Sequence, residues 1–314
     1  MQKGYLKIKA SAKINLTLDV LGKVENGYHQ ISTIFQEINL FDEIIFKKLS
    51  TPGIKLIIKG PESATLKSSH ELAENSILKT IKLLQGKYPQ LKNIGLNITL
   101  KKNIPVAAGL GGGSSNAAAT LKALNQLYHL KITNRQLQNL ASKIGMDVPF
   151  FIMGGLASGS HFGEKISSIF PSSNTHKVNL STASGASFLK NILILLPKNV
   201  QKISTQDVYQ QLDEIPKPQN KQSTKALLKA IKSQGQNANL KDITQFFCND
   251  FNLLYQKKFA SLQKELFQLG ATNVQLCGAG PALYAVFSTD EKLKTAYQKL
   301  KPKSKVWMSS ATQL

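Results

Sequence analysis

The feature that most constrains the fold is a glycine-rich segment between a predicted strand and a predicted helix. Apolar residues alternate over 96–100, as in a half-buried strand, and an alanine-rich run predicts a helix that begins near Ser114. Glycine lets backbone N–H groups approach an anion without hindrance from a Cβ atom. Because a helix N-terminus adds unpaired N–H donors, this strand–loop–helix order predicts a phosphate-binding segment.

The loop reads Gly109-Leu110-Gly111-Gly112-Gly113-Ser114-Ser115. The alternative is a flexible glycine hinge before a capped helix, but the serine hydroxyls offer further hydrogen bonds and favour the phosphate site. The loop is not a P-loop, since no Gly-Lys-Ser or Gly-Lys-Thr closes it. It is not a dinucleotide fingerprint either, because the last glycine and the acidic residue about 20 positions further on are missing.

The chain has 314 residues, which is enough for two domains. Helical and strand-like patterns occur in both halves, so we predict an α+β fold. The stretch 171–190 is small, polar and without periodicity, and we interpret it as a loop or linker. We therefore expect an N-terminal domain over 1–170 and a C-terminal domain over 191–314.

Hydrophobic periodicity also predicts the main elements. The expected strands cover 6–10, 14–20, 31–46 as one strand or two, 54–59, 96–100, 192–196, 273–276, 282–287 and 305–308. The expected helices cover 75–87, 135–144 with Asn134 as the cap, 223–233, 256–268 and 291–300, besides the one that begins near Ser114.

Charge helps to exclude one class of protein. Basic residues outnumber acidic ones by 40 to 18, for a formal net charge of +22. Lysine supplies nearly all of them, spread along the chain without a block, and Arg135 is the single arginine. Because nucleic-acid readers favour the planar arginine fork, this pattern predicts a solvated surface and no nucleic-acid partner.

Cys248 and Cys277 have no histidine or second cysteine at ligand spacing, so zinc is not expected. A chain of this size needs no disulfide. No apolar run reaches the length of about 18 residues that a membrane span needs, and we find no leader pattern. We therefore expect no membrane partner and a cytoplasmic location.

Two charged residues lie in apolar surroundings. Asp147 precedes Val148-Pro149-Phe150, and we interpret it as a candidate proton acceptor, with a turn-forming or capping aspartate as the alternative. Lys13 lies in a strand-like run and could offset charge on a phosphoryl group, with an exposed strand lysine as the alternative. A turn follows at Asn26-Gly27-Tyr28-His29, where two ring-bearing residues stand together.

Taken in order, these segments resemble the GHMP kinase superfamily. The matching runs are Ala12-Lys13-Ile14-Asn15, Gly27-Tyr28-His29, Pro105 with the loop 109–115 and Asn116, Gly145-Met146-Asp147-Val148-Pro149, and Gly278-Ala279-Gly280-Pro281. The resemblance covers about 7–306. It implies two domains, with the active site in the cleft between them.

The resemblance also implies roles for individual residues. Asp147 matches the family's catalytic base and Lys13 its partner. The positions that match the ATP site are Asn75, Lys102, Pro105, Gly109, Leu110, Gly111, Gly112, Gly113, Ser114 and Ser115. The positions that match the substrate site are Asn15, Tyr28, His29, Tyr209, Gly278 and Gly280, with a cytosine base held by Tyr28 and His29 and stacked on Tyr209.

The implied reaction moves the ATP γ-phosphate, with Mg²⁺, onto the 2-hydroxyl of a cytidine-diphospho-methylerythritol, a step of non-mevalonate isoprenoid synthesis. No residue stands out as a Mg²⁺ ligand. The alternatives are a GHMP kinase for a mevalonate-type alcohol, homoserine or a sugar, and a basic nucleic-acid-binding protein. Aromatic residues that could stack on a base argue against the first, and the dispersed lysines argue against the second.

Three positions depart from the family's pattern, and none removes a catalytic group. Ser11 stands where proline is usual, and Met146 replaces a small residue beside Asp147. Ala279 replaces a usual serine or threonine. Met146 and Ala279 put the shape of the pocket in doubt rather than the type of reaction.

Overall fold

The computed structural model describes residues 4–66, 74–169, 189–198, 200, 203–216, 222–234 and 240–312. The chain forms two compact units that interleave along the sequence. The first unit comprises Met1–Ala12, Leu40–Val106 and Gly111–Met153, and the second comprises Lys13–Asn39, Ala107–Leu110 and Gly154–Leu314. The predicted domain limits at 170 and 191 stay a prediction, and most of the predicted loop at 171–190 lies outside the described residues.

Two long strands, β1 (Tyr5–Lys23) and β2 (His29–Leu49), contribute residues to both units. The other elements of the first unit are β3 (Gly53–Lys59), β4 (Gly95–Lys101), α2 (Ser76–Lys87), α3 (Gly112–Leu127), α4 (Asn134–Ala141), α5 (Val148–Met153) and two short 3-10 turns. The strands of the second unit are β5 (Leu156–Ser160), β6 (Lys165–Ser168), β7 (Ile192–Pro197), β8 (Cys248–Asn249), β9 (Ala271–Leu276), β10 (Leu283–Phe287) and β11 (Ser304–Ser309). Its helices are α6 (Thr205–Asp213), α7 (Ser223–Gln234), α8 (Leu240–Thr244), α9 (Asn252–Gln268) and α10 (Asp290–Leu300).

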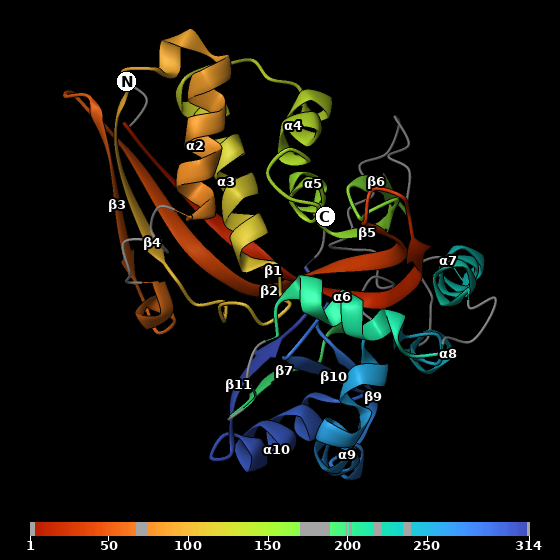
Figure 1. Ribbon diagram of the computed structural model, residues 1–314. Helices are drawn as coiled ribbons and strands as arrows, with labels where there is room; N and C mark the ends of the chain where they lie inside the picture. The colour runs from red at the N-terminus through yellow and green to blue at the C-terminus, as the bar shows by residue number, and fades with distance from the viewer. Residues whose placement is uncertain are drawn as a thin grey trace. The chain divides into compact units, whose positions relative to one another are not determined.

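In the first unit the strand order is β3-β4-β2-β1, with β3 parallel to β4 and β4 antiparallel to β2. Figure 1 shows α2 and α3 side by side next to these strands. Helix α2 buries Ile77, Ile81 and Leu84, which recur at helical spacing, so one face of the helix is apolar. Helix α2 is in contact with α3.

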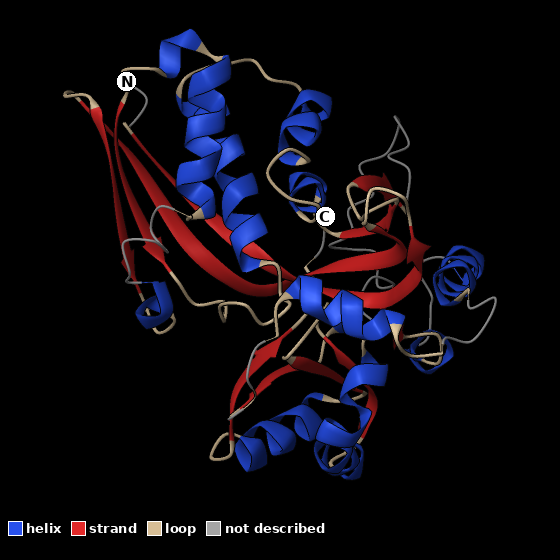
Figure 2. Ribbon diagram, viewed as in Figure 1, coloured by secondary structure: helices blue, strands red, loops and turns tan. Residues whose placement is uncertain are grey.

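In the second unit β2 pairs with β5, β5 pairs with β6, and β1 runs parallel to β8. A separate antiparallel sheet has the order β11-β7-β10-β9. Helices α9 and α10 lie along this sheet, and apolar side chains of the sheet and of both helices form one core, which includes Leu193, Leu266 and Leu293. Figure 2 shows helices and strands in both units, and the predicted α+β class is confirmed.

Local chemistry explains where two helices begin. Helix α3 starts at Gly112, two residues before the predicted start, because Gly111 takes the N-cap position at φ +71°. Helix α4 is capped by Thr133 rather than by Asn134, since the Thr133 side chain accepts from the N–H of Gln136 and the Gln136 side chain accepts in return. Within the described part of the chain, no helix is long and apolar enough to cross a bilayer.

Candidate active site

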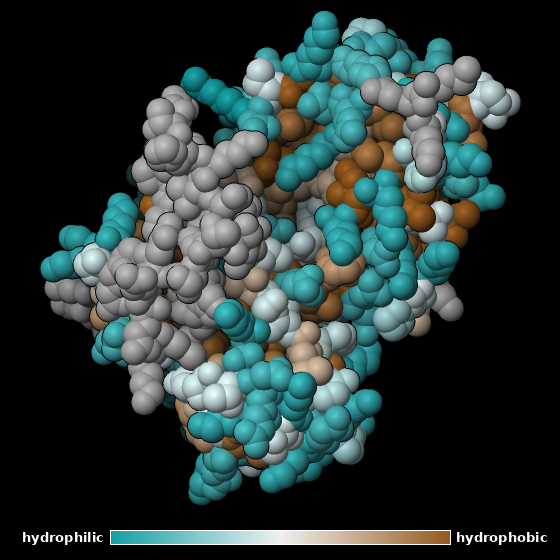
Figure 3. Space-filling model, turned by 180° about the vertical axis from the view of Figure 1, so that it is seen from behind, coloured by the Kyte–Doolittle hydropathy of each residue, from teal (hydrophilic) through white to brown (hydrophobic). Residues whose placement is uncertain are grey.

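Two lysines stand apart from the rest of this lysine-rich chain. The face of the molecule in Figure 3 is mostly hydrophilic, in keeping with a solvated basic surface. Among the described residues, however, Lys13 and Lys102 are buried, each with 3% of its surface exposed. A lysine is almost never fully buried without a partner, and both positions are predicted site residues. The alternative of an exposed strand lysine at position 13 is therefore wrong.

Lys13 lies in β1 within the second unit, among three other predicted site residues. Its backbone N–H donates to the carbonyl of Leu110 (3.0 Å), and its Nζ donates to Oδ1 of Asn15 (2.8 Å). Asn15 in turn donates from Nδ2 to the hydroxyl of Thr33 (2.8 Å). A Cβ atom on Gly278 would lie 3.3 Å from the Lys13 ammonium. These contacts fix the ammonium group beside the two glycine segments.

The glycine segments of the second unit pack directly against each other. A Cβ atom on Gly109 would lie 1.6 Å from the carbonyl oxygen of Cys277, and Gly109 has φ +81°, so no other residue fits there. Gly278 meets the same limit, because its Cβ atom would lie 2.9 Å from the Gly109 carbonyl. Asn249 holds this second segment by donating to the Gly278 carbonyl (2.7 Å). The structure thus brings Gly109, Leu110 and Gly278 together.

The remainder of the loop forms the start of α3 in the first unit. The cap residue Gly111 has no side chain to accept a hydrogen bond, so the first N–H groups of the helix are not capped from that position. Gly113 is exposed, Ser114 is half-buried and Ser115 is buried. This arrangement can accept an anion at the helix N-terminus.

Lys102 forms a buried ion pair with Asp42 in the first unit. Asp42 is 0% exposed, and its Oδ1 accepts from the N–H groups of Asn103 (2.7 Å) and Ile104 (2.8 Å). Burial lowers the pKa of Lys102, while the Asp42 carboxylate opposes this shift. A Cβ atom on Gly112 would lie 2.9 Å from the Lys102 ammonium, so the charge stands next to the start of α3. Sequence reasoning missed Asp42. No motif marks this residue, and only the antiparallel pairing of β2 with β4 brings it to Lys102.

The other predicted residues of the first unit occupy defined places. Asn75 is the N-cap of α2, where its side chain accepts from the N–H of Ile77 (3.0 Å), and Pro105 is buried. Asp147 is half-buried and directly precedes α5, which contacts α3 and α4. Asp147 belongs to the first unit and Lys13 to the second, so their pairing stays a prediction.

The predicted aromatic residues of the second unit make two separate contacts. His29 stacks on Tyr209 with ring centroids 4.7 Å apart and planes 19° apart. Tyr28 is 55% exposed, and its ring packs on that of Phe162 with ring centroids 5.3 Å apart. Sequence reasoning missed Phe162 as the partner of Tyr28, although its aromatic ring stands between His161 and Gly163 in the sequence.

One cluster in the described residues has side chains that could hold a metal ion. Asp19, Cys248 and Asp250 offer ligand atoms within 4.8 Å of one another, because β1 and β8 pair in register at Thr17 and Cys248. The thiol makes this set unsuited to Mg²⁺, which prefers oxygen ligands. The carboxylates also have structural uses, since Asp19 accepts from the N–H of Thr224 and Asp250 from that of Val20.

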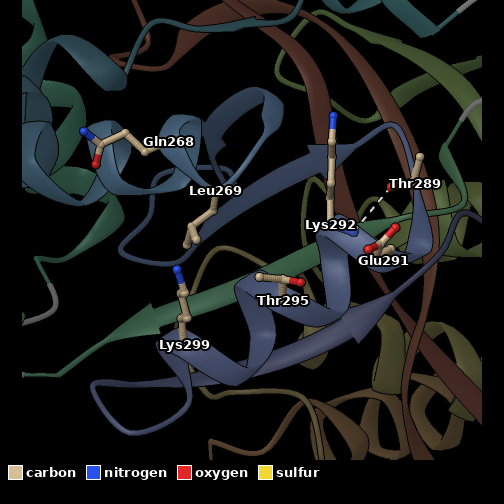
Figure 4. A pocket seen from close by; sticks show the side chains of 7 residues that line it. All are labelled: Gln268, Leu269, Thr289, Glu291, Lys292, Thr295 and Lys299. Atoms are coloured by element: carbon tan, nitrogen blue, oxygen red, sulfur yellow. Dashed lines mark hydrogen bonds between the residues drawn. The ribbon is translucent and has the colours of Figure 1, made fainter.

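A surface hollow of about 390 Å³ lies elsewhere in the second unit. Figure 4 shows its lining at the end of α9 and along α10, where the Lys292 N–H donates to the Thr289 hydroxyl to cap the helix. None of the predicted site residues lines it. Its polar side chains are those of ordinary helix surfaces, and we assign it no role.

The two cysteines are free thiols, and we expect them to differ in reactivity. Burial raises the pKa of Cys277 far above its usual range, whereas Cys248 is only half-buried. In native protein at pH 8, a thiol reagent should label Cys248, and Cys277 should react only after unfolding. Mass spectrometry of the labelled peptides measures this, with Cys248→Ser as the control. Labelling of Cys277 in the native state would contradict the burial.

Comparison with known proteins places this site in a family. The family model of the GHMP kinases N terminal domain matches residues 75–155, and that of the GHMP kinases C terminal domain matches residues 227–304. The fold and the paired glycine segments thus define a GHMP-type kinase. The chain belongs to the GHMP kinase family, in the branch of the 4-diphosphocytidyl-2-C-methyl-D-erythritol kinases.

Relatives along nearly the whole chain carry that assignment. A 4-diphosphocytidyl-2-C-methyl-D-erythritol kinase of Caldanaerobacter subterraneus subsp. tengcongensis is 35% identical over 94% of this chain and 93% of its own length. One of Clostridium kluyveri is 36% identical over 95% of this chain and 96% of its own. A crystal structure of 4-(cytidine 5'-diphospho)-2C-methyl-D-erythritol kinase shares the fold, with a TM-score of 0.70 and 24% sequence identity. The match covers 98% of this chain and 100% of that chain. The predicted family and the predicted class of enzyme, an ATP-dependent small-molecule kinase, are confirmed.

Proposed function

We propose that this kinase transfers the γ-phosphate of ATP, together with Mg²⁺, to the 2-hydroxyl of 4-diphosphocytidyl-2-C-methyl-D-erythritol. The observation that carries the proposal is the meeting of Lys13, Asn15, Gly109 and Gly278 in the second unit of a chain whose relatives bear that substrate's name. The product would serve isoprenoid precursor synthesis. A cytoplasmic location stays a prediction.

In this proposal ATP lies along the segment Gly109–Ser115. The unpaired N–H groups at the start of α3 hold its phosphates, and the buried Lys102 adds positive charge beside Gly112. Asn75 and Pro105 would border the adenine. Ser114 and Ser115 offer hydroxyl oxygens of the kind that Mg²⁺ accepts beside nucleotide phosphates, and the ion would supply charge neutralisation there.

The chemistry then requires a group that takes the proton of the substrate hydroxyl. Asp147 is the carboxylate that we propose for this step, since it is half-buried at the start of α5. Lys13 would stabilise negative charge on the transferred group, because Asn15 and the Leu110 carbonyl hold it in place. Phosphoryl transfer needs mainly such positioning and charge stabilisation.

The cytosine would lie beside Tyr28, His29 and Tyr209. Because the His29 and Tyr209 rings are in direct contact, no base fits between those two rings. The exposed Tyr28 is therefore the ring that we expect to cover one face of the base. The ring of Tyr209 packs against that of Phe251, with ring centroids 4.9 Å apart. This apolar contact would keep Tyr209 in place to stack on the base.

Replacing Tyr209 with alanine should weaken substrate binding by roughly 1–3 kcal/mol, the usual worth of one base–aromatic stack. The Michaelis constant for the cytidine substrate should rise, while that for ATP should not change. Steady-state kinetics measure both, and Tyr5→Ala, at an exposed tyrosine of the first unit, is the matched control. An unchanged substrate constant in Tyr209→Ala would remove Tyr209 from the base site.

Turnover tests the whole proposal. Purified protein is incubated with ATP, Mg²⁺ and 4-diphosphocytidyl-2-C-methyl-D-erythritol, and ³¹P NMR follows ADP together with a new phosphate monoester. Mevalonate, homoserine and galactose are run in parallel as alternative alcohols. Phosphorylation of one of these in place of the cytidine substrate would contradict the proposal, and so would salt-sensitive RNA binding without saturable binding of cytidine nucleotides.

A further inference from the structure

Asp213, which no sequence motif singles out, contacts the ring of His29 in the second unit. The Nε2 atom of His29 lies 2.8 and 2.9 Å from the two carboxylate oxygens of Asp213. The His29 side chain is 6% exposed, whereas that of Asp213 is 34% exposed. The ring is therefore enclosed, and the carboxylate reaches it from the edge of the site. Two oxygens at one nitrogen restrict the rotation of the ring.

Helix α6 supplies a second constraint on the same ring. Tyr209 lies four residues before Asp213, so both side chains project from one face of the helix. Tyr209 stacks on the His29 ring and sets its plane, while Asp213 sets its rotation within that plane. Val208 and Leu212 are fully buried in the core beneath, so the helix that carries both contacts is firmly seated.

This contact also decides which ring nitrogen carries the proton. Among the described residues, the ring of His29 forms hydrogen bonds through Nε2, and the partner is the Asp213 carboxylate. A carboxylate only accepts, so Nε2 holds a hydrogen, and this leaves Nδ1 as the nitrogen that carries the lone pair whenever the ring holds a single proton. Nδ1 then accepts a hydrogen bond from an amino group and is repelled by a carbonyl oxygen.

We propose that Asp213 is a positioning residue for base recognition. It holds His29 with Nδ1 as an acceptor, and Nδ1 takes a hydrogen bond from the 4-amino group of cytosine. The same atom rejects uracil, which presents a 4-oxo oxygen at that place. The inference rests on the proposed function, in which a cytosine base lies beside His29.

The test is Asp213→Ala, which removes both acceptor oxygens beside Nε2. Without an acceptor at Nε2, nothing holds the ring hydrogen on that nitrogen or fixes the rotation of the ring, so Nδ1 is no longer held ready as the acceptor. The Michaelis constant for the cytidine substrate should rise by about 10-fold or more, as expected for an unsatisfied buried polar contact. The preference in kcat/KM for the cytidine substrate over its uridine counterpart should fall by a similar factor, with kcat within about twofold.

Two variants control for structural effects. Asp207→Asn changes an exposed acidic residue in the first turn of the same helix and should leave the base preference unchanged. Asp213→Glu keeps the carboxylate and should retain most of the preference. Spectra of ¹⁵N-histidine-labelled protein report the tautomer directly, with His29→Gln identifying the His29 signals. The His29 nitrogen signals should show the loss of the fixed Nε2–H tautomer in Asp213→Ala and no change in Asp207→Asn.

An unchanged base preference and an unchanged tautomer in Asp213→Ala would overturn the inference. Failure of the proposed function looks different, because the wild type would then phosphorylate neither the cytidine nor the uridine compound. The ¹⁵N spectra would still show whether Asp213 sets the tautomer of His29. A lost tautomer preference with unchanged discrimination between the two bases would also overturn the recognition role.

Discussion

Asp147→Asn should lower kcat by about 10²–10⁴-fold, the usual contribution of a general base. Asparagine has nearly the same size, but its amide cannot accept the proton of the substrate hydroxyl. Asp147 is half-buried, directly precedes α5 and lies outside the glycine segment 109–115. The dissociation constant for ATP should therefore stay within about twofold, as measured by calorimetry beside the turnover assay.

Asp290→Asn is the matched control for this substitution, because Asp290 is a carboxylate 63% exposed in α10. Its turnover should equal that of the wild type. Unchanged turnover in Asp147→Asn would remove the assignment of the base. Loss of ATP binding together with turnover would show that Asp147 acts through the nucleotide site or the fold, which also contradicts its role as the base.

Lys102→Met should lower the free energy of unfolding by about 3 kcal/mol, since it leaves the Asp42 carboxylate buried without its cation. Two backbone N–H groups still reach Asp42, from Asn103 and Ile104, and they place the effect at the lower end of the range for broken buried pairs. Urea denaturation measures the change. ATP binding should weaken as well, because the lost charge stands beside Gly112.

Lys101→Met controls for the loss of the neighbouring lysine, which is the last residue of β4. Lys101 is 51% exposed and pairs with Glu43, and such solvent-screened surface pairs contribute little to stability. The double variant Lys102→Met with Asp42→Asn should recover part of the stability, because it removes both charges and keeps an oxygen acceptor for Asn103. Equal stability of the Lys101 and Lys102 variants would refute the buried pair.

Much of the fold was predictable because its signals are local. The alternation over 96–100 and the alanines after Ser115 determine β4 and α3, and the predicted strand at 192–196 is β7. Short elements were missed, among them α6, β5 and β6, because four to nine residues show too little periodicity to separate helix, strand and loop. The cap of α4 was assigned one residue late, since Thr133 and Asn134 are both good caps and only the bond to Gln136 distinguishes them.

The amino-acid sequence by itself determined the family, the glycine segment and the residues that belong to each predicted site. Those properties depend on short runs such as 109–115, where neighbouring residues act together. Only the tertiary structure decided which residues accompany them: Asp42 at Lys102 across paired strands, and Asp213 at His29 across 184 positions. The physical reason is that burial and ion pairing depend on distances between segments far apart in the chain, which no local pattern encodes.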